Sequence, residues 1–200
     1  MSRQGTDLDQ AVDCLRRGEI IAYPTEGVYG LGCDALDEGA VQRLLELKQR
    51  PREKGLIVIG ASLPQLEPLL YPLTRMQRTR LEASWPAAVT WVVPAALDAP
   101  DWLTGGRDTI AVRVPGHEQA RELCRRFRRP VVSTSANRAG SLPLRSVEAV
   151  AAEFGDQLAY LLEGAVGDQA GPSQMRDLRS GNIIRPESSD QQERGHRDGK

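Results

Sequence analysis

Three cations close together in the chain are the first candidates for chemistry. Lys48, Arg50 and Lys54 surround Pro51, in a sequence whose only other lysine is Lys200. Arginine offers a planar fork to an anion and lysine offers a compact point charge, so together they suit a phosphate group. Cations also stabilise the C-terminus of a helix, and helix capping is the alternative interpretation.

A segment of small hydroxyls and an amide is the second candidate. Ser133-Thr134-Ser135-Ala136-Asn137 follows the apolar Val131-Val132. Open α/β sheets bind ligands at the ends of their strands, so this segment is well placed for donors and acceptors. A polar turn is the alternative. A serine nucleophile is not expected, because the chain lacks a G-x-S-x-G motif and its only histidines are His117 and His196.

Two glycine- and proline-containing stretches complete the set of unusual segments. The stretch 23–32, YPTEGVYGLG, would let a backbone approach a ligand closely. Its glycine order matches neither a P-loop nor a dinucleotide fingerprint, and a tight turn is the alternative. The later stretch 171–177, GPSQMRD, with Arg185 beyond it, is by itself only another turn.

The elements that must position these segments follow from apolar spacing. Helices are expected over residues 8–17, 39–48, 64–70, 75–83, 117–127 and 146–154. Strands are expected over residues 20–23, 56–59, 89–93, 109–114, 131–135, 158–162 and 182–185, with a loop over 24–34. Alternating strands and helices predict a single α/β domain with a partly parallel sheet. We expect this domain to span residues 7–187 and the polar stretch 188–200 to be a disordered tail.

Composition limits the class of protein. The chain has 200 residues, of which 40% are hydrophobic and 26% charged, which is typical of one globular domain. It has no apolar run of membrane-spanning length, and residues 1–10 lack the apolar stretch of a signal peptide, so none is expected. Cys14, Cys33 and Cys124 form no C-x-x-C motif, so neither a disulfide framework nor a zinc site is predicted. A cytoplasmic protein without membrane contact and without a metal held by its own side chains is expected.

Charge is clustered although the net charge is only −1. Residues 121–129 contain Arg121, Arg125, Arg126, Arg128 and Arg129 against a single glutamate. Such a cluster is typical of a surface that binds nucleic acid, although most charged runs are simply solvated faces.

Five motifs, in this order, carry a resemblance to a known family: YPTEGVYGLGCD, LKQRPREKGLI, TIAVRVPGH, VVSTSAN and GPSQMRDL…GNIIRP. Over about residues 7–187 the chain resembles the YrdC-like family, and within it the single-domain TsaC-type threonylcarbamoyl-AMP synthases. The resemblance implies a twisted open mixed sheet with flanking helices around a positively charged cavity. It also implies a nucleotidyltransferase that makes threonylcarbamoyl-AMP and pyrophosphate from L-threonine, bicarbonate and ATP. Downstream transfer proteins would then use the product for N6-threonylcarbamoyladenosine at tRNA position 37.

The resemblance assigns roles to residues at matching positions. The family's K-x-R and S-x-N residues fall on Lys48, Arg50, Ser135 and Asn137, which would be catalytic and hold the nucleotide. Further ATP-side positions are Lys54, Thr90 and Arg185, and threonine-side positions are Thr25, Tyr29, Arg113 and Ser173. Mg²⁺, brought in with ATP, is the only cofactor implied.

One departure and two alternatives accompany the resemblance. Where the family has P-G-P-x-T, this chain has Pro86-Ala87-Ala88-Val89-Thr90, which removes a glycine and a proline from a loop. The first alternative is a maturation module that binds tRNA or double-stranded RNA without catalysis. The second is the YrdC-like domain of hydrogenase-maturation carbamoyltransferases, which are longer proteins with zinc-finger cysteines that this chain lacks.

Overall fold

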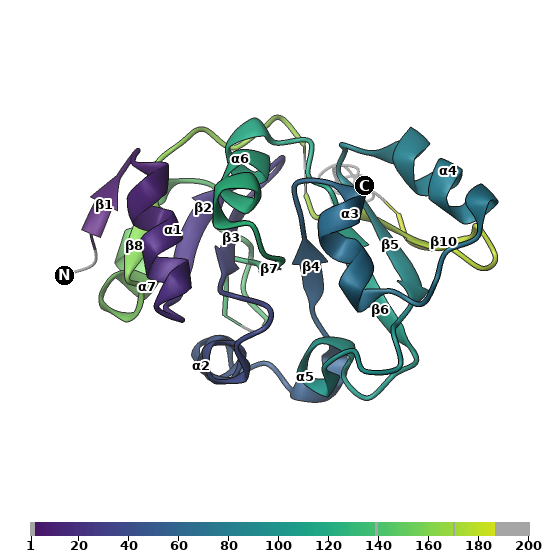
Figure 1. Ribbon diagram of the computed structural model, residues 1–200. Coiled ribbons are helices and arrows are strands. Elements are labelled where there is room, and N and C mark those ends of the chain that lie inside the picture. The colour runs from purple at the N-terminus through teal and green to yellow at the C-terminus, as the bar shows by residue number, and fades with distance from the viewer. Residues whose placement is uncertain (1–2, 139, 170, 187–200) are drawn as a thin grey trace, which may run out of the picture.

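The computed structural model describes residues 3–138, 140–169 and 171–186, and within them the fold is one mixed sheet flanked by helices (Figure 1). The strands are β1 (Arg3–Gly5), β2 (Ile21–Pro24), β3 (Tyr29–Gly32), β4 (Ile57–Ile59), β5 (Val89–Pro94), β6 (Thr109–Arg113), β7 (Val131–Ser135), β8 (Tyr160–Leu162), β9 (Gln174–Asp177) and β10 (Ile183–Arg185). The helices are α1 (Leu8–Arg16), α2 (Glu38–Lys48), α3 (Leu63–Leu66), α4 (Arg75–Ser84), α5 (Asp101–Thr104), α6 (Glu118–Phe127) and α7 (Val147–Phe154), with 3₁₀ turns η1 (Arg52–Lys54), η2 (Glu67–Leu69) and η3 (Gly155–Gln157).

The ten strands of the described residues follow the order β1-β8-β2-β3-β7-β4-β6-β5-β9-β10. Parallel pairs join β1 and β2 to β8, β4 to β6, and β5 to β9. The remaining neighbours are antiparallel, including β7 with both β3 and β4. Strand β7 therefore joins the two halves of the sheet at its centre. The mixed open α/β sheet expected from the sequence is confirmed.

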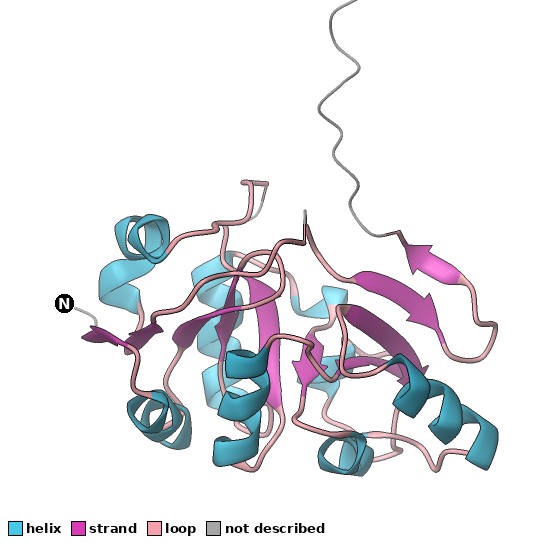
Figure 2. Cartoon of the chain, turned by 90° about the horizontal axis from the view of Figure 1, so that it is seen from above, coloured by secondary structure: helices cyan, strands magenta, loops and turns pink. Residues whose placement is uncertain are grey.

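Apolar side chains pack on both faces of the sheet. Successive side chains of a strand point to opposite sides, and they enter two different apolar clusters. Ile21 and Tyr23 of β2 belong to one apolar cluster, while Ala22 between them belongs to the other. Helices α1, α6, α3 and α4 lie in a row along one face of the sheet, as the view from above shows (Figure 2). This arrangement leaves the strand ends and their loops to form the walls of a site.

Local sequence signals define the helix that carries Lys48. The Asp37 carboxylate caps the start of α2 by accepting a hydrogen bond from the Ala40 amide at 3.0 Å. The helix ends at Lys48, and Gln49 takes a left-handed conformation with φ of 51°. This stop turns the chain sharply, so that Arg50 and η1 leave the helix toward the sheet.

The expectation of a loop over residues 24–34 was wrong, because β3 occupies Tyr29–Gly32 in the middle of it. Glycine in a strand often marks the close approach of another group. A side chain at Gly32 would come within 2.6 Å of the Val132 carbonyl and 2.8 Å of the Tyr23 ring. Gly32 is thus required by packing inside the sheet, whereas Gly27 lies in the connection between β2 and β3.

Besides β3, three further elements were missed by the sequence analysis, and the elements that were expected are present within a few residues. Strand β9 was interpreted as a turn, α5 lies in a stretch that was not assigned, and β1 lies before residue 7. The helix expected over 64–70 is divided into α3 and η2. The predicted tail, 188–200, lies outside the described residues. In the described part of the chain, no helix is both long and apolar enough to cross a membrane.

Candidate functional site

A pocket with a volume of about 140 Å³ opens where loops from both halves of the sheet meet. Its lining includes the connection between β2 and β3, Arg50, and the ends of β6 and β7. Residues 171–173 and Arg185 complete the lining. The site is therefore built from segments that are distant in the sequence but adjacent at strand ends.

Three arginines line this pocket against one carboxylate, that of Glu26. Burial lowers the pKa of Arg185, and the neighbouring charges of Arg113 and Arg50 lower it further. Burial also lowers the pKa of Arg50. The guanidinium groups are thus close enough to repel one another, and an anion placed between them would relieve that repulsion.

Backbone carbonyls hold two of these arginines in place. Arg185 donates hydrogen bonds from Nε and Nη2 to the Ser173 carbonyl, at 3.2 and 2.8 Å. Arg50 donates from Nη2 to the Gly55 carbonyl at 2.9 Å, whereas its buried Nε has no hydrogen-bond partner. Charged donors with unused hydrogens at a pocket wall are suited to phosphate or carboxylate oxygens.

Lys48 lies behind the pocket wall and binds the S-x-N segment. Its ammonium donates to the Ser135 carbonyl, to the Asn137 carbonyl at 2.7 Å and to Asn137 Oδ1 at 3.3 Å. Ser135 Oγ donates to the same Oδ1 at 2.6 Å. The side chain is only 5% exposed, and burial together with Arg50 lowers the pKa of Lys48 to about 8. The four residues of the predicted tetrad therefore lie together, with the lysine organising the segment that carries Ser135 and Asn137.

Hydroxyl groups occupy the other side of the pocket. Ser173 Oγ shares a hydrogen bond of 2.7 Å with Thr90 Oγ1, and Thr90 is completely buried. Tyr29 donates its phenolic hydrogen to the Gly164 carbonyl at 2.8 Å, and Thr25 Oγ1 donates to the Val28 carbonyl at 2.7 Å. Thr90 thus reaches the pocket only through Ser173.

The structure brings most of the predicted site residues together. Those that line the pocket are Thr25, Tyr29, Arg50, Arg113, Ser135, Ser173 and Arg185. Lys48, Asn137 and Thr90 lie directly behind them, and Lys54 is exposed on η1 and does not line the pocket. Sequence reasoning missed Glu26 and Gln169 as lining residues, although Glu26 lies inside the glycine-rich motif that was singled out.

The substituted loop lies outside this lining, and the described residues offer no cluster of side chains for a metal ion. Ala87 and Ala88 do not line the pocket, and their backbones bond to Val114 and Gln174. Among the described residues, no group of three or more His, Cys, Asp or Glu side chains could hold a metal ion. Glu26 is the single carboxylate in the lining, and it already faces Arg113.

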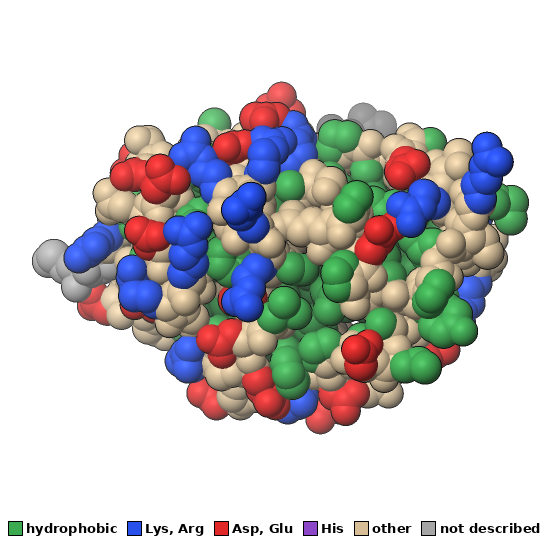
Figure 3. Space-filling model, viewed as in Figure 1, with side chains coloured by type: hydrophobic (Ala, Val, Ile, Leu, Met, Phe, Trp, Pro, Cys, Tyr) green, Lys and Arg blue, Asp and Glu red, His purple; other side chains and the backbone are tan. Residues whose placement is uncertain are grey.

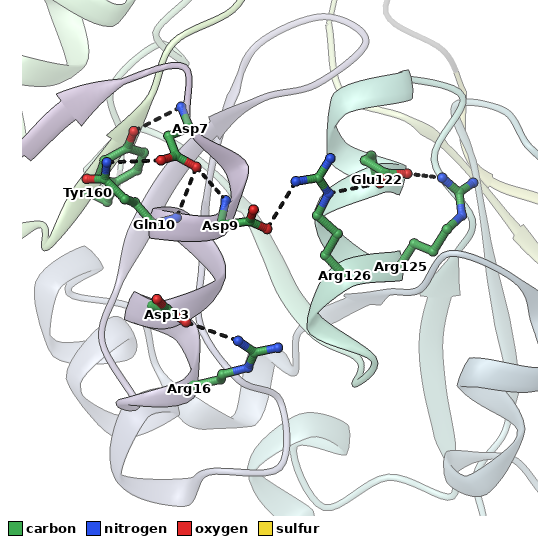
Figure 4. A network of polar contacts seen from close by, with 9 residues as sticks. All are labelled: Asp7, Asp9, Gln10, Asp13, Arg16, Glu122, Arg125, Arg126 and Tyr160. Carbon is green, nitrogen blue, oxygen red and sulfur yellow. Dashed lines mark hydrogen bonds and ion pairs between the residues drawn. The ribbon is translucent and has the colours of Figure 1, made fainter.

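The arginine-rich helix α6 differs from the pocket in that most of its arginines form ion pairs with acidic side chains. Arg126 contacts Asp9 of α1 at 3.0 Å and Glu122 at 2.9 Å, and Arg125 also contacts Glu122 (Figure 4). Basic and acidic side chains accordingly alternate over the face formed by α1 and α6 (Figure 3). Arg121 and Arg129 have acidic partners as well, whereas the exposed Arg128 forms no ion pair with a described residue. Charges of both signs are typical of a solvated surface, and a nucleic-acid interface on this face stays a prediction.

Comparison with known proteins agrees with the fold and the motifs. Residues 13–186 match the Sua5/YciO/YrdC family, whose description is telomere recombination. A threonylcarbamoyl-AMP synthase from Cellvibrio japonicus is 49% identical over 179 residues, which cover 90% of this chain and 95% of the relative. The enzyme of the same name from Vibrio cholerae is 49% identical over 181 residues, covering 90% and 96%.

Solved structures give the same result. The crystal structure of P. abyssi Sua5 complexed with L-threonine has a TM-score of 0.82 and 34% identity, covering 90% of this chain and 54% of Sua5. E. coli YciO has a TM-score of 0.81 with 24% identity, covering 96% of this chain and 98% of YciO, and it supports the fold alone. From motifs, fold and relatives together, the chain belongs to the Sua5/YciO/YrdC family.

Proposed function

We propose that this chain is an L-threonylcarbamoyladenylate synthase, an enzyme that supplies threonylcarbamoyl-AMP for modification of tRNA position 37. The observation that carries the proposal is the meeting of Arg50, Arg113 and Arg185 with several hydroxyl side chains in one pocket, beside a buried lysine. The two relatives at 49% identity are both named threonylcarbamoyl-AMP synthase, and this chain matches nearly the whole length of each. Transfer of AMP from ATP to a carboxylate oxygen makes the reaction a nucleotidyl transfer.

The reaction needs positioning and charge, and it needs no covalent enzyme intermediate. The threonine nitrogen bonds to the carbon of bicarbonate, water leaves, and a carbamate forms. A carbamate oxygen then attacks the α-phosphorus of ATP, and pyrophosphate leaves with the electrons of the broken P–O bond. Preorganised cations at the phosphates lower the barrier to such a transfer. A site of arginines, a lysine, hydroxyls and an amide matches this demand.

The proposed roles divide the pocket into two sides. On the nucleotide side, Lys48, Arg50 and Arg185 would stabilise the charge that develops on the phosphates. Ser135 and Asn137 would hold the adenylate, with Lys54 approaching from the exposed turn η1. The threonine side would consist of Thr25, Tyr29, Arg113 and Ser173. Thr90 would act there by fixing the Ser173 hydroxyl, because it is buried behind that residue.

The nucleotide substrate in this proposal is MgATP. Magnesium retains several waters and is usually bound through substrate phosphates and one or two carboxylates. The lining offers one carboxylate, which already faces an arginine. The phosphate oxygens would therefore be the main ligands of the ion.

The direct test is pyrophosphate release by the purified protein with ATP, bicarbonate and L-threonine, with the adenylate identified by mass spectrometry. We expect release that depends on all three substrates and that falls sharply when L-serine replaces L-threonine. Threonine-independent release, or no release, would contradict the proposal. Binding of tRNA without threonine-dependent release would instead favour the non-catalytic RNA-binding alternative.

A further inference from the structure

Glu26 is the one acidic side chain among the described residues that line the pocket, and it belongs neither to the proposed nucleotide side nor to the proposed threonine side. Its side chain is only 14% exposed. Oε1 accepts a hydrogen bond from the Gly116 amide at 2.8 Å, and Oε2 lies 3.4 Å from Arg113 Nη1. The carboxylate thus contacts the end of β6 and the turn that follows it.

The backbone on either side of Glu26 is fixed. Its carbonyl accepts a hydrogen bond from the Gln169 amide at 3.0 Å. A side chain at Gly167 would lie 2.5 Å from the Glu26 carbonyl, and one at Gly27 would lie 2.7 Å from the Gln169 carbonyl. The two segments are therefore in direct backbone contact, which only glycine permits. The Glu26 carboxylate consequently projects from a rigid support.

The turn that Glu26 contacts is held from its other side as well. Arg121 Nη1 on α6 donates hydrogen bonds to the carbonyls of Pro115 and Gly116, at 2.9 and 3.0 Å. Glu26 belongs to the connection after β2, whereas Arg113 ends β6, and three strands separate β2 from β6 in the sheet. The Glu26 carboxylate therefore links the two halves of the sheet across the pocket.

Arg113 depends on this carboxylate for its charge balance. The arginine is 7% exposed, and its buried Nε has no hydrogen-bond partner. Glu26 is the only acid that forms an ion pair with it in the described part of the chain. The other charged groups of the lining are the guanidiniums of Arg50 and Arg185. Without Glu26, Arg113 would face like charges alone and would turn away from them.

We propose that Glu26 is a positioning residue that holds Arg113 in the orientation needed to bind the carboxylate of the amino-acid substrate. Glu26 Oε2 is buried and accepts no hydrogen bond, so this oxygen acts on its ion-pair partner Arg113 and not on a molecule in the pocket. This inference rests on the proposed function, in which Arg113 faces the threonine carboxylate. It adds a determinant of threonine affinity that lies outside the assigned threonine residues.

A double-mutant cycle tests this coupling. Glu26→Gln keeps an oxygen for the Gly116 amide but removes the charge, and Arg113→Met removes the guanidinium. We expect each variant to raise KM for L-threonine by about tenfold, because each weakens the contact between the Arg113 guanidinium and the threonine carboxylate. The double variant should be no worse than Arg113→Met alone, because coupled residues are not additive. Glu26→Gln should leave kcat and KM for ATP within about twofold of wild type.

The matched control is Glu67→Gln, which removes the carboxylate of another glutamate–arginine pair, with Arg78, outside the pocket lining. It should leave KM for L-threonine unchanged. Multiplicative effects of the two pocket variants, or a Glu26→Gln enzyme with unchanged KM for L-threonine, would overturn the proposal. So would a Glu26→Gln protein whose only change is a lower unfolding temperature.

The outcome is separable from that of the proposed function. If wild-type protein shows no threonine-dependent turnover, the proposed function fails, and the same cycle is read by urea unfolding. Coupling between Glu26 and Arg113 in the unfolding free energy would then still support the positioning contact, and additivity there would contradict it.

Discussion

Two groups of arginines in this molecule have opposite environments. On α6 they lie close in sequence, at the surface, and pair with acids three or four residues away or on α1. In the pocket Arg50, Arg113 and Arg185 come from distant segments, and the one carboxylate among the described lining residues pairs with Arg113 alone. Spacing of three and four residues on a helix produces paired surface charge. Buried cations with little counter-charge mark the ligand site, whereas density of arginine along the sequence does not.

The sharpest test of this contrast removes one arginine from each group. Arg50→Ala should lower kcat/KM for pyrophosphate release by about 30- to 1000-fold, because a preorganised cation at the phosphates is lost. This corresponds to a loss of about 2–4 kcal/mol in transition-state stabilisation. Arg125→Ala on α6 should leave kcat/KM within about twofold of wild type. Similar losses in both variants would remove the distinction between the two groups.

The buried lysine gives a pH-dependent test of the pocket. Its pKa is lowered to about 8, and the phosphates of bound ATP should raise it again. ATP binding at pH 8 should therefore take up part of a proton, measurable by titration calorimetry in buffers of different ionisation enthalpy. Because the free lysine loses its charge above pH 8, kcat/KM for ATP should fall there by up to about tenfold per pH unit.

Lys48→Arg is the control for that measurement, since arginine remains charged throughout this range. Equal proton uptake by this variant would show that another group titrates. The pH dependence of stability has the opposite sign to the pH dependence of activity. An unfolded lysine titrates near 10.5, so the folded chain binds fewer protons between about pH 8 and 10.5, and this residue's contribution to the unfolding free energy rises with pH in that window.

A smaller effect is expected where a residue acts behind the pocket wall. Thr90→Val removes the hydroxyl that bonds to Ser173 Oγ at 2.7 Å. The unfolding free energy should fall by about 1–3 kcal/mol, because a buried polar group loses its partner. KM for L-threonine should rise a few-fold. Thr90→Ser retains the hydroxyl and should restore both values, and failure to do so would assign the effect to the lost methyl group.

The smallest effect is expected on the outer face. Arg126→Ala removes contacts with Asp9 and Glu122 that are largely exposed (Figure 4). The unfolding free energy should fall by less than about 1 kcal/mol, and the loss should shrink in high salt. Urea unfolding at two salt concentrations measures both. A loss above 2 kcal/mol, or any change in KM, would mean that this face is more than a solvated surface.

Much of the fold was predictable because its signals are local. Apolar spacing identified α2 and the other longer helices. The strands β3 and β9 were missed, because glycines in one and polar residues in the other depend on neighbouring strands for their burial. Such tertiary requirements leave no periodic pattern in a single sequence.

The candidate site was predictable as a set of motifs but not as a geometry. The motifs identified residues that line the pocket, including Arg50 and Ser173. That Thr90 lies behind Ser173 depends on side-chain direction, which spacing does not give. Glu26 was overlooked because a lone acid in a glycine-rich stretch is typical of a surface turn. Its burial becomes evident only when β6 is placed opposite it.

The central claim is that the three arginines of the pocket hold ATP beside L-threonine. A crystal structure with L-threonine and a non-hydrolysable ATP analogue tests it most directly. We expect the phosphates between Arg50 and Arg185, with the threonine carboxylate at Arg113. A nucleotide bound on the face of α1 and α6, or phosphates without contact to any of the three arginines, would contradict it.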